Sequence, residues 1–487
     1  MAPLVLTALP EGEKVVRRRM RRDPRPHFLP DVSGQMDPIF GCPALSVPKD
    51  HIAHAVRDLI ARLDVSAAEA LYSSQGRRGY HPRHMLGALV LGSLLGEHAS
   101  TRLGQSLRTD AALRLVSGGY AISAGRLRAF RQRHAELFAD CIEQSVKMAF
   151  ELGLLDEKEL AVDAMRLRAN AARNEARTLD HATKRIKELE AVDPATLSPD
   201  DSKVRDEKLV KHRHTVAECT KRGSTNIVAT NPSASLMKFP TGATAPGHRI
   251  TVTAAGTSRR LVIAVLVDAD PNDYGKLAPA LQQARAVLTR AGVPPDTPLQ
   301  AAADAGYNSE ADLRFAERNR HWVDVLVPMQ ATPHADTMTK GYFGRDKFVI
   351  LQDGKMHCPA GTQMRGPISN GDERVLYRGV GCEQCPIKAQ CTPHKRRAIT
   401  LHPAVDRQRK LMRERMEQPD AADRYKHRMA TVEPVFSSLQ HGMNFRRSTT
   451  RHDGAIVAEI LLKVLAHNIS RLAAAKRLAV VVCAFET

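Results

Sequence analysis

Three acidic residues stand in contexts that could bring carboxylates together for chemistry on phosphate. Asp163 closes a short apolar run, Asp304 follows an alanine-rich segment, and Glu433 lies in one of the most basic stretches of the chain. Carboxylate oxygens suit Mg²⁺, and two such ions can activate water and stabilise the leaving oxygen when a phosphodiester is cut. The three acids therefore predict a metal-dependent site for cutting DNA.

Other acids compete for this role, because the chain has 53 Asp and Glu and most acids face solvent or cap helices. Asp268 and Asp270 are the main competitors, although Asp270-Pro-Asn-Asp also suits a plain turn between a strand and a helix. Asp304 could itself be a turn residue before Gly306. The joint placement of three acids in distinct contexts favours the catalytic interpretation.

The elements that must position these acids alternate between strands and helices. Two apolar segments joined by Gly-Thr-Ser predict a β-hairpin, and two polar segments around Pro194 and Pro199 predict an inserted helical hairpin. The predicted elements are hairpin strands at 248–255 and 260–268, a helix at about 275–291, a strand leading into Asp304, a helix at about 309–319 and a strand at 322–327. This order predicts a mixed α/β sheet.

Composition points to a nucleic acid as the partner. Lys and Arg number 72 against 53 acids, a net charge of +19 that attracts a polyanion. The longest apolar run, 85–96, falls short of the roughly 20 residues that span a bilayer. The apolar N-terminal residues precede the basic ones, the reverse of a secretory signal. We therefore expect a cytoplasmic, nucleoid-associated protein with no membrane segment.

A helical region precedes the catalytic segments. Apolar residues recur at spacings of three and four, and an Arg-rich helix at 124–134 follows a break at Gly118-Gly119. Arg128, Arg131 and Arg133 of this helix could contact DNA phosphates as part of a helix-turn-helix-like reader. The alternative is a solvated helix face, since charge alone does not separate the two.

Four cysteines fall between strand 322–327 and Glu433. Cys358, Cys382, Cys385 and Cys391 could bind a structural Zn²⁺, because the Cys-x2-Cys pair has the spacing of a zinc knuckle. Buried or free thiols are the alternative. Either interpretation predicts an insertion in the catalytic domain.

Three sequence blocks resemble the signatures of DDE transposases, closest to the IS1182 group of bacterial insertion sequences within the IS4/IS5-like assemblage. The blocks are Ala161-Val-Asp163, Ala303-Asp-Ala-Gly-Tyr-Asn-Ser309 and Tyr425-x2-Arg428-x4-Glu433-Pro-Val-Phe436. The resemblance implies a ribonuclease-H-like fold in which Asp163, Asp304 and Glu433 hold two Mg²⁺ or Mn²⁺ ions. It also implies that Tyr425 and Arg428 contact double-stranded DNA, both transposon ends and target, and that a homodimer forms on DNA.

The region 394–451 is the strongest candidate for DNA-backbone binding, with fourteen Lys or Arg against six acids, and it includes Arg446 and Arg447. Gln440 and Ser437 stand where the family usually has Lys and Gly. These departures keep open a weakened, DNA-binding relative, and a nuclease without strand transfer is the other alternative. The expected domains are a disordered or extended basic arm (1–46), a helical DNA-binding domain (47–157), a catalytic domain (158–450) with insertions at about 173–245 and 330–400, and a C-terminal helix and tail (451–487).

Overall fold

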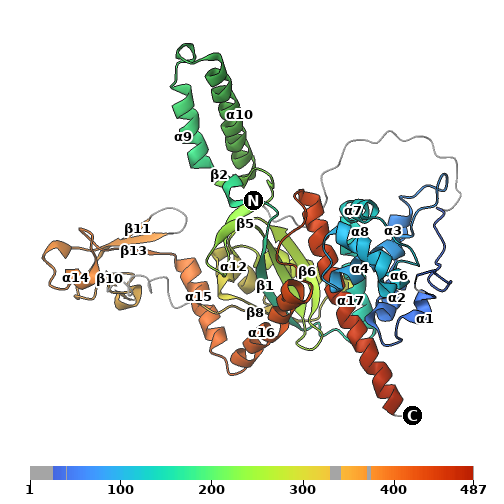
Figure 1. Ribbon diagram of the computed structural model, residues 1–487. Helices are drawn as coiled ribbons and strands as arrows, with labels where there is room; N and C mark the ends of the chain where they lie inside the picture. Colours follow the sequence, from blue (N-terminus) through green and yellow to red (C-terminus); the bar gives the residue numbers. More distant parts are fainter. Residues whose placement is uncertain (1–25, 40, 330–341, 352, 370–373, 486–487) are drawn as a thin grey trace. The chain divides into compact units, whose positions relative to one another are not determined.

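The computed structural model describes residues 26–39, 41–329, 342–351, 353–369 and 374–485 (Figure 1). The described chain is an α/β protein with a mixed sheet and many helices, as the sequence predicts. By packing it divides into a first unit, Met1–Leu299 with His427–Thr487, and a second unit, Gln300–Lys426. The expected domain limits do not follow this division and stay a prediction. Residues 1–25 of the expected N-terminal arm lie outside the described residues.

The first unit begins with a helical region, as predicted. Its α4 is buried on all sides, which explains the long apolar run without a membrane segment. The helices are α1 (Pro43–Ser46), α2 (Ile52–Ala61), α3 (Ser66–Glu69), α4 (Pro82–Leu94), α5 (Ser100–Thr109), α6 (Ala111–Val116), α7 (Ala124–Arg133) and α8 (Ala135–Glu151). No helix among the described residues is long and apolar enough to cross a membrane.

The C-terminal helix is a core element of the same unit. The helix α17 (Asp453–Phe485) packs against α2, α4, α7, α8 and strand β6 (Leu261–Asp268). Figure 1 shows α17 in red beside the blue N-terminal helices. A C-terminal helix is present, and most of its side chains within 453–475 are buried.

The sheet of the first unit carries Asp163 on a strand that is well paired. Strand β1 (Glu159–Arg168) pairs antiparallel with β5 (Thr244–Ala255), and Asp163 lies opposite Val252. Strand β5 also pairs antiparallel with β6 and with β4 (Ser235–Lys238). The β5–β6 hairpin is the one that the sequence predicts, and helix α11 (Leu277–Ala291) follows it as expected.

The predicted helical hairpin is present. Helices α9 (Leu179–Glu190) and α10 (Pro199–Arg222) pack against each other as a hairpin (Figure 1), and β2 (Ala176–Thr178) pairs with β3 (Asn226–Val228) where the hairpin joins the unit. Ser198 caps α10 by accepting a hydrogen bond from the backbone N–H of Asp201. Gly223 ends the helix in the left-handed conformation, at φ +59°.

The second unit continues the alternation of strand and helix and then holds the cysteine-rich insertion. Strand β7 (Leu299–Ala303), helix α12 (Glu310–Arg318) and strand β8 (Val323–Leu326) match the predicted elements. The insertion contains β9 (Val349–Ile350), β10 (Met356–His357), β11 (Arg365–Ser369), β12 (Val375–Arg378), α14 (Lys388–Cys391) and β13 (Ala398–Leu401), and α15 (Pro403–Met416) follows it. Residues 330–341 and 370–373 of this region lie outside the described residues.

Candidate active site

Asp163 lies in the middle of β1, where the sheet fixes its backbone. The three preceding residues are buried, and the Asp163 side chain keeps 21% of its surface exposed. One carboxylate oxygen accepts a hydrogen bond of 2.7 Å from the N–H of Ala164. The strand continues to Arg168, so this acid does not end its strand as an apolar run alone suggests. A rigid strand is the kind of support that a catalytic carboxylate needs.

Arg428 reaches the other carboxylate oxygen of Asp163. Its Nη1 lies 2.6 Å from Asp163 Oδ2, and only 8% of the Arg428 side chain is exposed. Such a short ion pair between partly buried groups is stronger than a surface pair. The residues are 265 positions apart in sequence. The structure therefore brings two of the predicted site residues into contact, and any contact of Arg428 with DNA would compete with this pair.

Helix α16 (Ala421–Ser437) carries Tyr425, Arg428 and Glu433 on one continuous element. A proline favours a kink or a new helix start, because the residue before it resists the helical conformation, and the structure shows no new start at Pro434. Proline lacks the N–H that would bond the carbonyl of Ala430 four residues earlier. Arg260 supplies the missing donor, because its Nε donates to Ala430 O at 2.8 Å. This bond compensates for Pro434 within the helix.

Glu433 is exposed on α16, whereas Arg428 is buried. The separation of five positions advances the helix by about 7.5 Å and turns it by about 140°. The two side chains therefore leave α16 in different directions. Tyr425, which is half-buried, belongs to the part of α16 in the second unit.

Asp304 directly follows β7 in the second unit. It occupies the position before a short 3-10 turn, Ala305–Tyr307, and its carbonyl accepts from the N–H of Tyr307 at 3.0 Å. Its side chain makes no capping hydrogen bond to that turn, and Tyr307 is fully buried. A carboxylate at the end of a buried strand matches the predicted position of the second acid.

Metal binding was expected at these acids. Their donor chemistry suits a hard divalent cation, since all three contribute carboxylate oxygens. Within the ranges that the structure describes, no three His, Cys, Asp or Glu side chains lie close enough together to hold an ion. The assignment of Asp163, Asp304 and Glu433 as metal ligands thus stays a prediction.

The competing acids have a structural role. Asp268 and Asp270 both face the buried Lys276, whose Nζ lies 3.3 Å and 3.5 Å from their carboxylates. Burial raises the pKa of Asp268, and the nearby Lys276 acts against this shift. These contacts between the end of β6 and the start of α11 hold the connecting turn. The turn interpretation therefore accounts for both acids.

Most of the arginines that were predicted to bind DNA are exposed, but Arg131 is buried. Arg128 and Arg133 are exposed on α7, and Arg446 and Arg447 are exposed after α16. Arg131 is a correction, because only 6% of it is exposed and its guanidinium bonds to groups inside the protein. The break predicted at Gly118-Gly119 is present between α6 and α7, and both glycines have positive φ.

The four cysteines of the insertion line one cavity with an accessible volume of about 320 Å³. All four are free thiols, and burial together with the neighbouring cysteines raises the pKa of Cys391. Their side chains are nevertheless not arranged as a metal-binding group in the described structure. The zinc interpretation is therefore not confirmed. Cys391 belongs to the small hydrophobic core of the insertion, and Cys358, Cys382 and Cys385 are partly exposed beside it.

Helix α17 contains polar residues whose roles the sequence analysis did not identify. Asn468, fully buried, accepts from Val262 N and donates to Val262 O, both at 2.9 Å, and so binds β6 as a neighbouring strand would. His467 contacts Ser438 Oγ at 3.1 Å and Arg260 O at 2.9 Å, and its burial lowers its pKa to about 4. Polar residues inside the apolar run 455–469 are the signal that could have revealed them.

Lys463 of α17 gives a prediction about pH. Burial lowers its pKa from 10.5 to about 7, against the attraction of Glu459. Between these values the unfolded chain binds the proton and the folded chain does not, so stability from this group rises with pH. We expect urea unfolding to show this rise between about pH 7 and pH 10.5 in the wild type and not in Lys463→Met. Lys147→Met, at an exposed position on α8, should keep the rise; an equal rise in Lys463→Met would contradict the assignment.

Comparison with protein families adds two matches. A model described as a transposase DDE domain matches residues 357–473, which include all of α16. A model described as a transposase domain (DUF772) matches residues 44–133, which include α2 to α7. No curated protein matches the chain.

Proposed function

Because the chain is a DDE transposase with the domain arrangement of the IS1182 group, we propose that it cleaves DNA at transposon ends and joins the freed ends to target DNA. The observation that carries this proposal is the ion pair between Arg428, within the matched DDE domain, and Asp163 on β1. It ties the helix of the third signature block to the strand of the first. Transposases act on DNA, and the basic character of the chain agrees with such a partner.

We further propose a ribonuclease-H-like catalytic fold. The order of elements supports it: β1 with the first acid, the β5–β6 hairpin, α11, β7 with the second acid, α12, β8, and then α16 with the third. The helical hairpin and the cysteine-rich segment interrupt this order as insertions. We also propose a homodimer on paired ends and a cytoplasmic, nucleoid-associated location.

In this proposal Asp163, Asp304 and Glu433 are the ligands of two Mg²⁺ or Mn²⁺ ions. Bound ions would supply an activated water and charge stabilisation at the leaving 3′ oxygen. Arg428, held against Asp163, would offer its planar donors to a phosphate once Asp163 binds metal. Tyr425 would contact DNA from the same helix.

Exposed cations would hold the DNA backbone. Arg446 donates from Nε to Gln440 O at 3.3 Å and contacts His441 Nδ1 at 2.9 Å. The guanidinium of Arg446 thus lies beside Gln440, whose own side chain is uncharged. This contact favours an active enzyme over the weakened DNA-binding relative. Arg447, Arg128 and Arg133 would add phosphate contacts, which give salt-dependent affinity.

One assay separates the alternatives. Purified protein is incubated with Mg²⁺ and DNA that carries the ends of the element encoding it. The proposal expects nicks with 3′-hydroxyl ends and joined products. Nicks without joining would indicate a nuclease, and binding without nicks would indicate a DNA-binding relative, so either outcome would contradict the proposed function.

We also propose that Cys358, Cys382, Cys385 and Cys391 bind one Zn²⁺, which requires their side chains to rotate towards a common centre. Zinc with four thiolates is a common structural site, and the small core of this insertion would gain stability from it. Elemental analysis should find one zinc per chain, reduced in Cys382→Ser and Cys385→Ser and unchanged in Cys42→Ser. Zinc-free protein of unchanged stability would refute the site.

A further inference from the structure

The segment Asn444–Thr450 follows α16 and contains the exposed Arg446 and Arg447. Its backbone is hydrogen-bonded to the end of β1. Ser448 N donates to Arg168 O at 2.8 Å, and Arg168 N donates to Arg446 O at 3.3 Å. Asn170 donates from its side chain to Thr449 O at 3.1 Å. These bonds extend the sheet in the parallel direction at this point. The backbone of the segment is therefore fixed to the strand that carries Asp163.

Helix α17 holds the same segment through a buried carboxylate. Glu459 has no exposed surface. Its two oxygens accept from Thr449 N at 3.2 Å and 3.0 Å, from Thr449 Oγ1 at 2.6 Å and from Thr450 Oγ1 at 3.3 Å. A buried carboxylate is costly unless such donors satisfy it. Glu459 therefore favours the one arrangement of the segment that supplies them.

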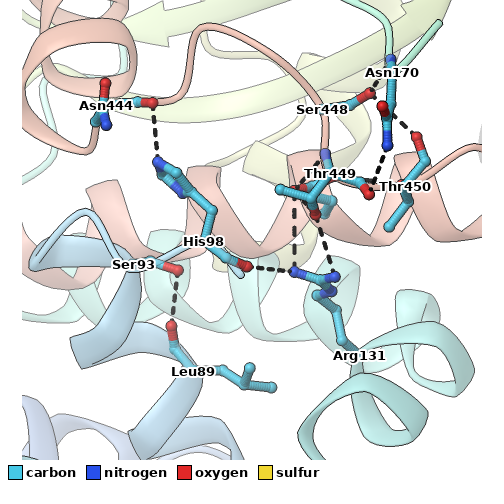
Figure 2. Close-up of polar contacts among 10 residues, drawn as sticks. Leu89, Ser93, His98, Arg131, Asn170, Asn444, Ser448, Thr449 and Thr450 are labelled. Carbon is cyan, nitrogen blue, oxygen red and sulfur yellow. Dashed lines mark hydrogen bonds and ion pairs between the residues drawn. The ribbon is translucent and has the colours of Figure 1, made fainter. Parts of the chain in front are cut away.

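The N-terminal helical region completes the cluster (Figure 2). Arg131 of α7 donates from Nη2 to Thr449 Oγ1 at 3.3 Å and from Nη1 to His98 O at 3.1 Å, and Nη1 lies 3.9 Å from Glu459. His98 Nε2 in turn contacts Asn444 O at 2.9 Å. The Thr449 hydroxyl lies between an arginine of one region and a carboxylate of another. It connects α7 with α17.

We propose that Arg131, Thr449 and Glu459 are positioning residues that orient Arg446 and Arg447 for the DNA backbone. The cluster lies within the first unit and links the region matched by the DUF772 model to the region matched by the DDE model. It explains why an arginine of the Arg-rich helix is buried. The DNA-contacting residues of α7 and those of the segment Asn444–Thr450 are then held at fixed positions relative to each other. This inference rests on the proposed function, since it requires both arginines to bind DNA.

The test is a double-mutant cycle read out as DNA affinity. Thr449→Val removes the hydroxyl with little change of shape at an exposed position, and Thr449→Ser keeps it. The probe is a fluorescein-labelled DNA duplex of mixed sequence, titrated at several salt concentrations. Loss of a hydrogen bond that positions both arginines should weaken binding by roughly three- to tenfold in Thr449→Val. Thr449→Ser should bind as the wild type does.

A variant that lacks both arginines shows whether Thr449 affects DNA binding through Arg446 and Arg447. Arg446→Gln combined with Arg447→Gln should weaken binding and lower the salt slope by about two. In that background Thr449→Val should have no further effect. An equal loss in both backgrounds, or a loss in Thr449→Ser, would overturn the positioning role alone. If the double Gln variant binds DNA as the wild type does, the proposed DNA contact fails, and the inference with it.

Thermal unfolding of each variant checks that the fold is kept. If Thr449→Val does not fold, Glu459→Gln takes its place in the test. The glutamine retains an oxygen that accepts from Thr449 N, and it lacks the negative charge that Arg131 faces. It should weaken binding in the wild-type background and not in the double Gln background. The opposite pattern would refute the role of Glu459.

Discussion

Asp304→Asn is expected to slow Mg²⁺-dependent DNA cleavage by roughly 10³-fold or more, while DNA binding persists. Metal ions stabilise the transition state by several kcal/mol, and each 1.36 kcal/mol corresponds to a factor of ten in rate. The amide keeps the shape of the side chain but is a poorer ligand without charge. Single-turnover cleavage of labelled transposon-end DNA measures the rate. The same loss is expected for Asp163→Asn and for Glu433→Gln.

Matched controls separate loss of a ligand from loss of any acid. Asp296→Asn changes an exposed aspartate in the turn before β7, and Glu417→Gln changes an exposed glutamate at the end of α15. Both should cleave at nearly the wild-type rate. Asp304→Asn with normal cleavage would remove Asp304 from the site and leave the family assignment intact.

Glu459→Ala is expected to lower the free energy of unfolding by about 3–5 kcal/mol, the cost of removing one partner of a buried ion pair. The substitution leaves the buried guanidinium of Arg131 without its anion. It also removes the acceptor of Thr449 N and of two hydroxyl groups. Urea unfolding measures the change.

The control is Glu151→Ala at the end of α8, where the carboxylate is largely exposed and pairs with Lys147. An exposed pair of this kind contributes about 0–1 kcal/mol. If Glu459→Ala were no more destabilising than Glu151→Ala, the buried cluster would not stabilise the structure as described. The free energy of unfolding of Glu459→Gln is expected to lie between those of the wild type and Glu459→Ala, because the amide oxygen can accept hydrogen bonds but carries no charge.

Much of the framework could be predicted from periodicity and turn residues. The β5–β6 hairpin, α11, β7, α12 and β8 all occur where the sequence predicts them, because apolar strands and amphipathic helices have different periods. The positions of Asp163 and Asp304 on or after strands follow from the same reasoning. The relation of the acids to one another does not, because it depends on packing between residues far apart in sequence.

The role of Arg131 shows where pattern reasoning failed and how it could have succeeded. Counting arginines on α7 treats all of them as equivalent. The buried residues of α7 are Leu127, Phe130 and Arg131, and His134, which caps its end, is buried too. Their spacing of three, four and seven is that of a buried helix face. Arg131 lies within this face, whereas Arg128 and Arg133 lie outside it. A charge on an apolar face predicts a buried partner, here Glu459.

Helix α16 gives a second example. Local rules favour a break at Pro434, since proline removes a helical hydrogen bond. The donor that compensates, Arg260, comes from the β5–β6 hairpin, 170 residues earlier. Its contribution could not be predicted from the sequence near Pro434. Continuity of α16 is what places Arg428 and Glu433 on one rigid element.

The most direct test of the central claim, that Asp163 is a metal ligand of a DNA-cleaving site, is exchange of its ligand atom. Asp163→Cys replaces an oxygen ligand by a sulfur ligand, which Mg²⁺ accepts poorly and the softer Mn²⁺ accepts better. Cleavage of transposon-end DNA is measured with each metal, with Asp163→Ala as the control. The account predicts that Asp163→Cys is inactive with Mg²⁺ and regains cleavage with Mn²⁺, whereas Asp163→Ala is inactive with both. Cleavage by Asp163→Ala with Mg²⁺ at the wild-type rate would contradict it.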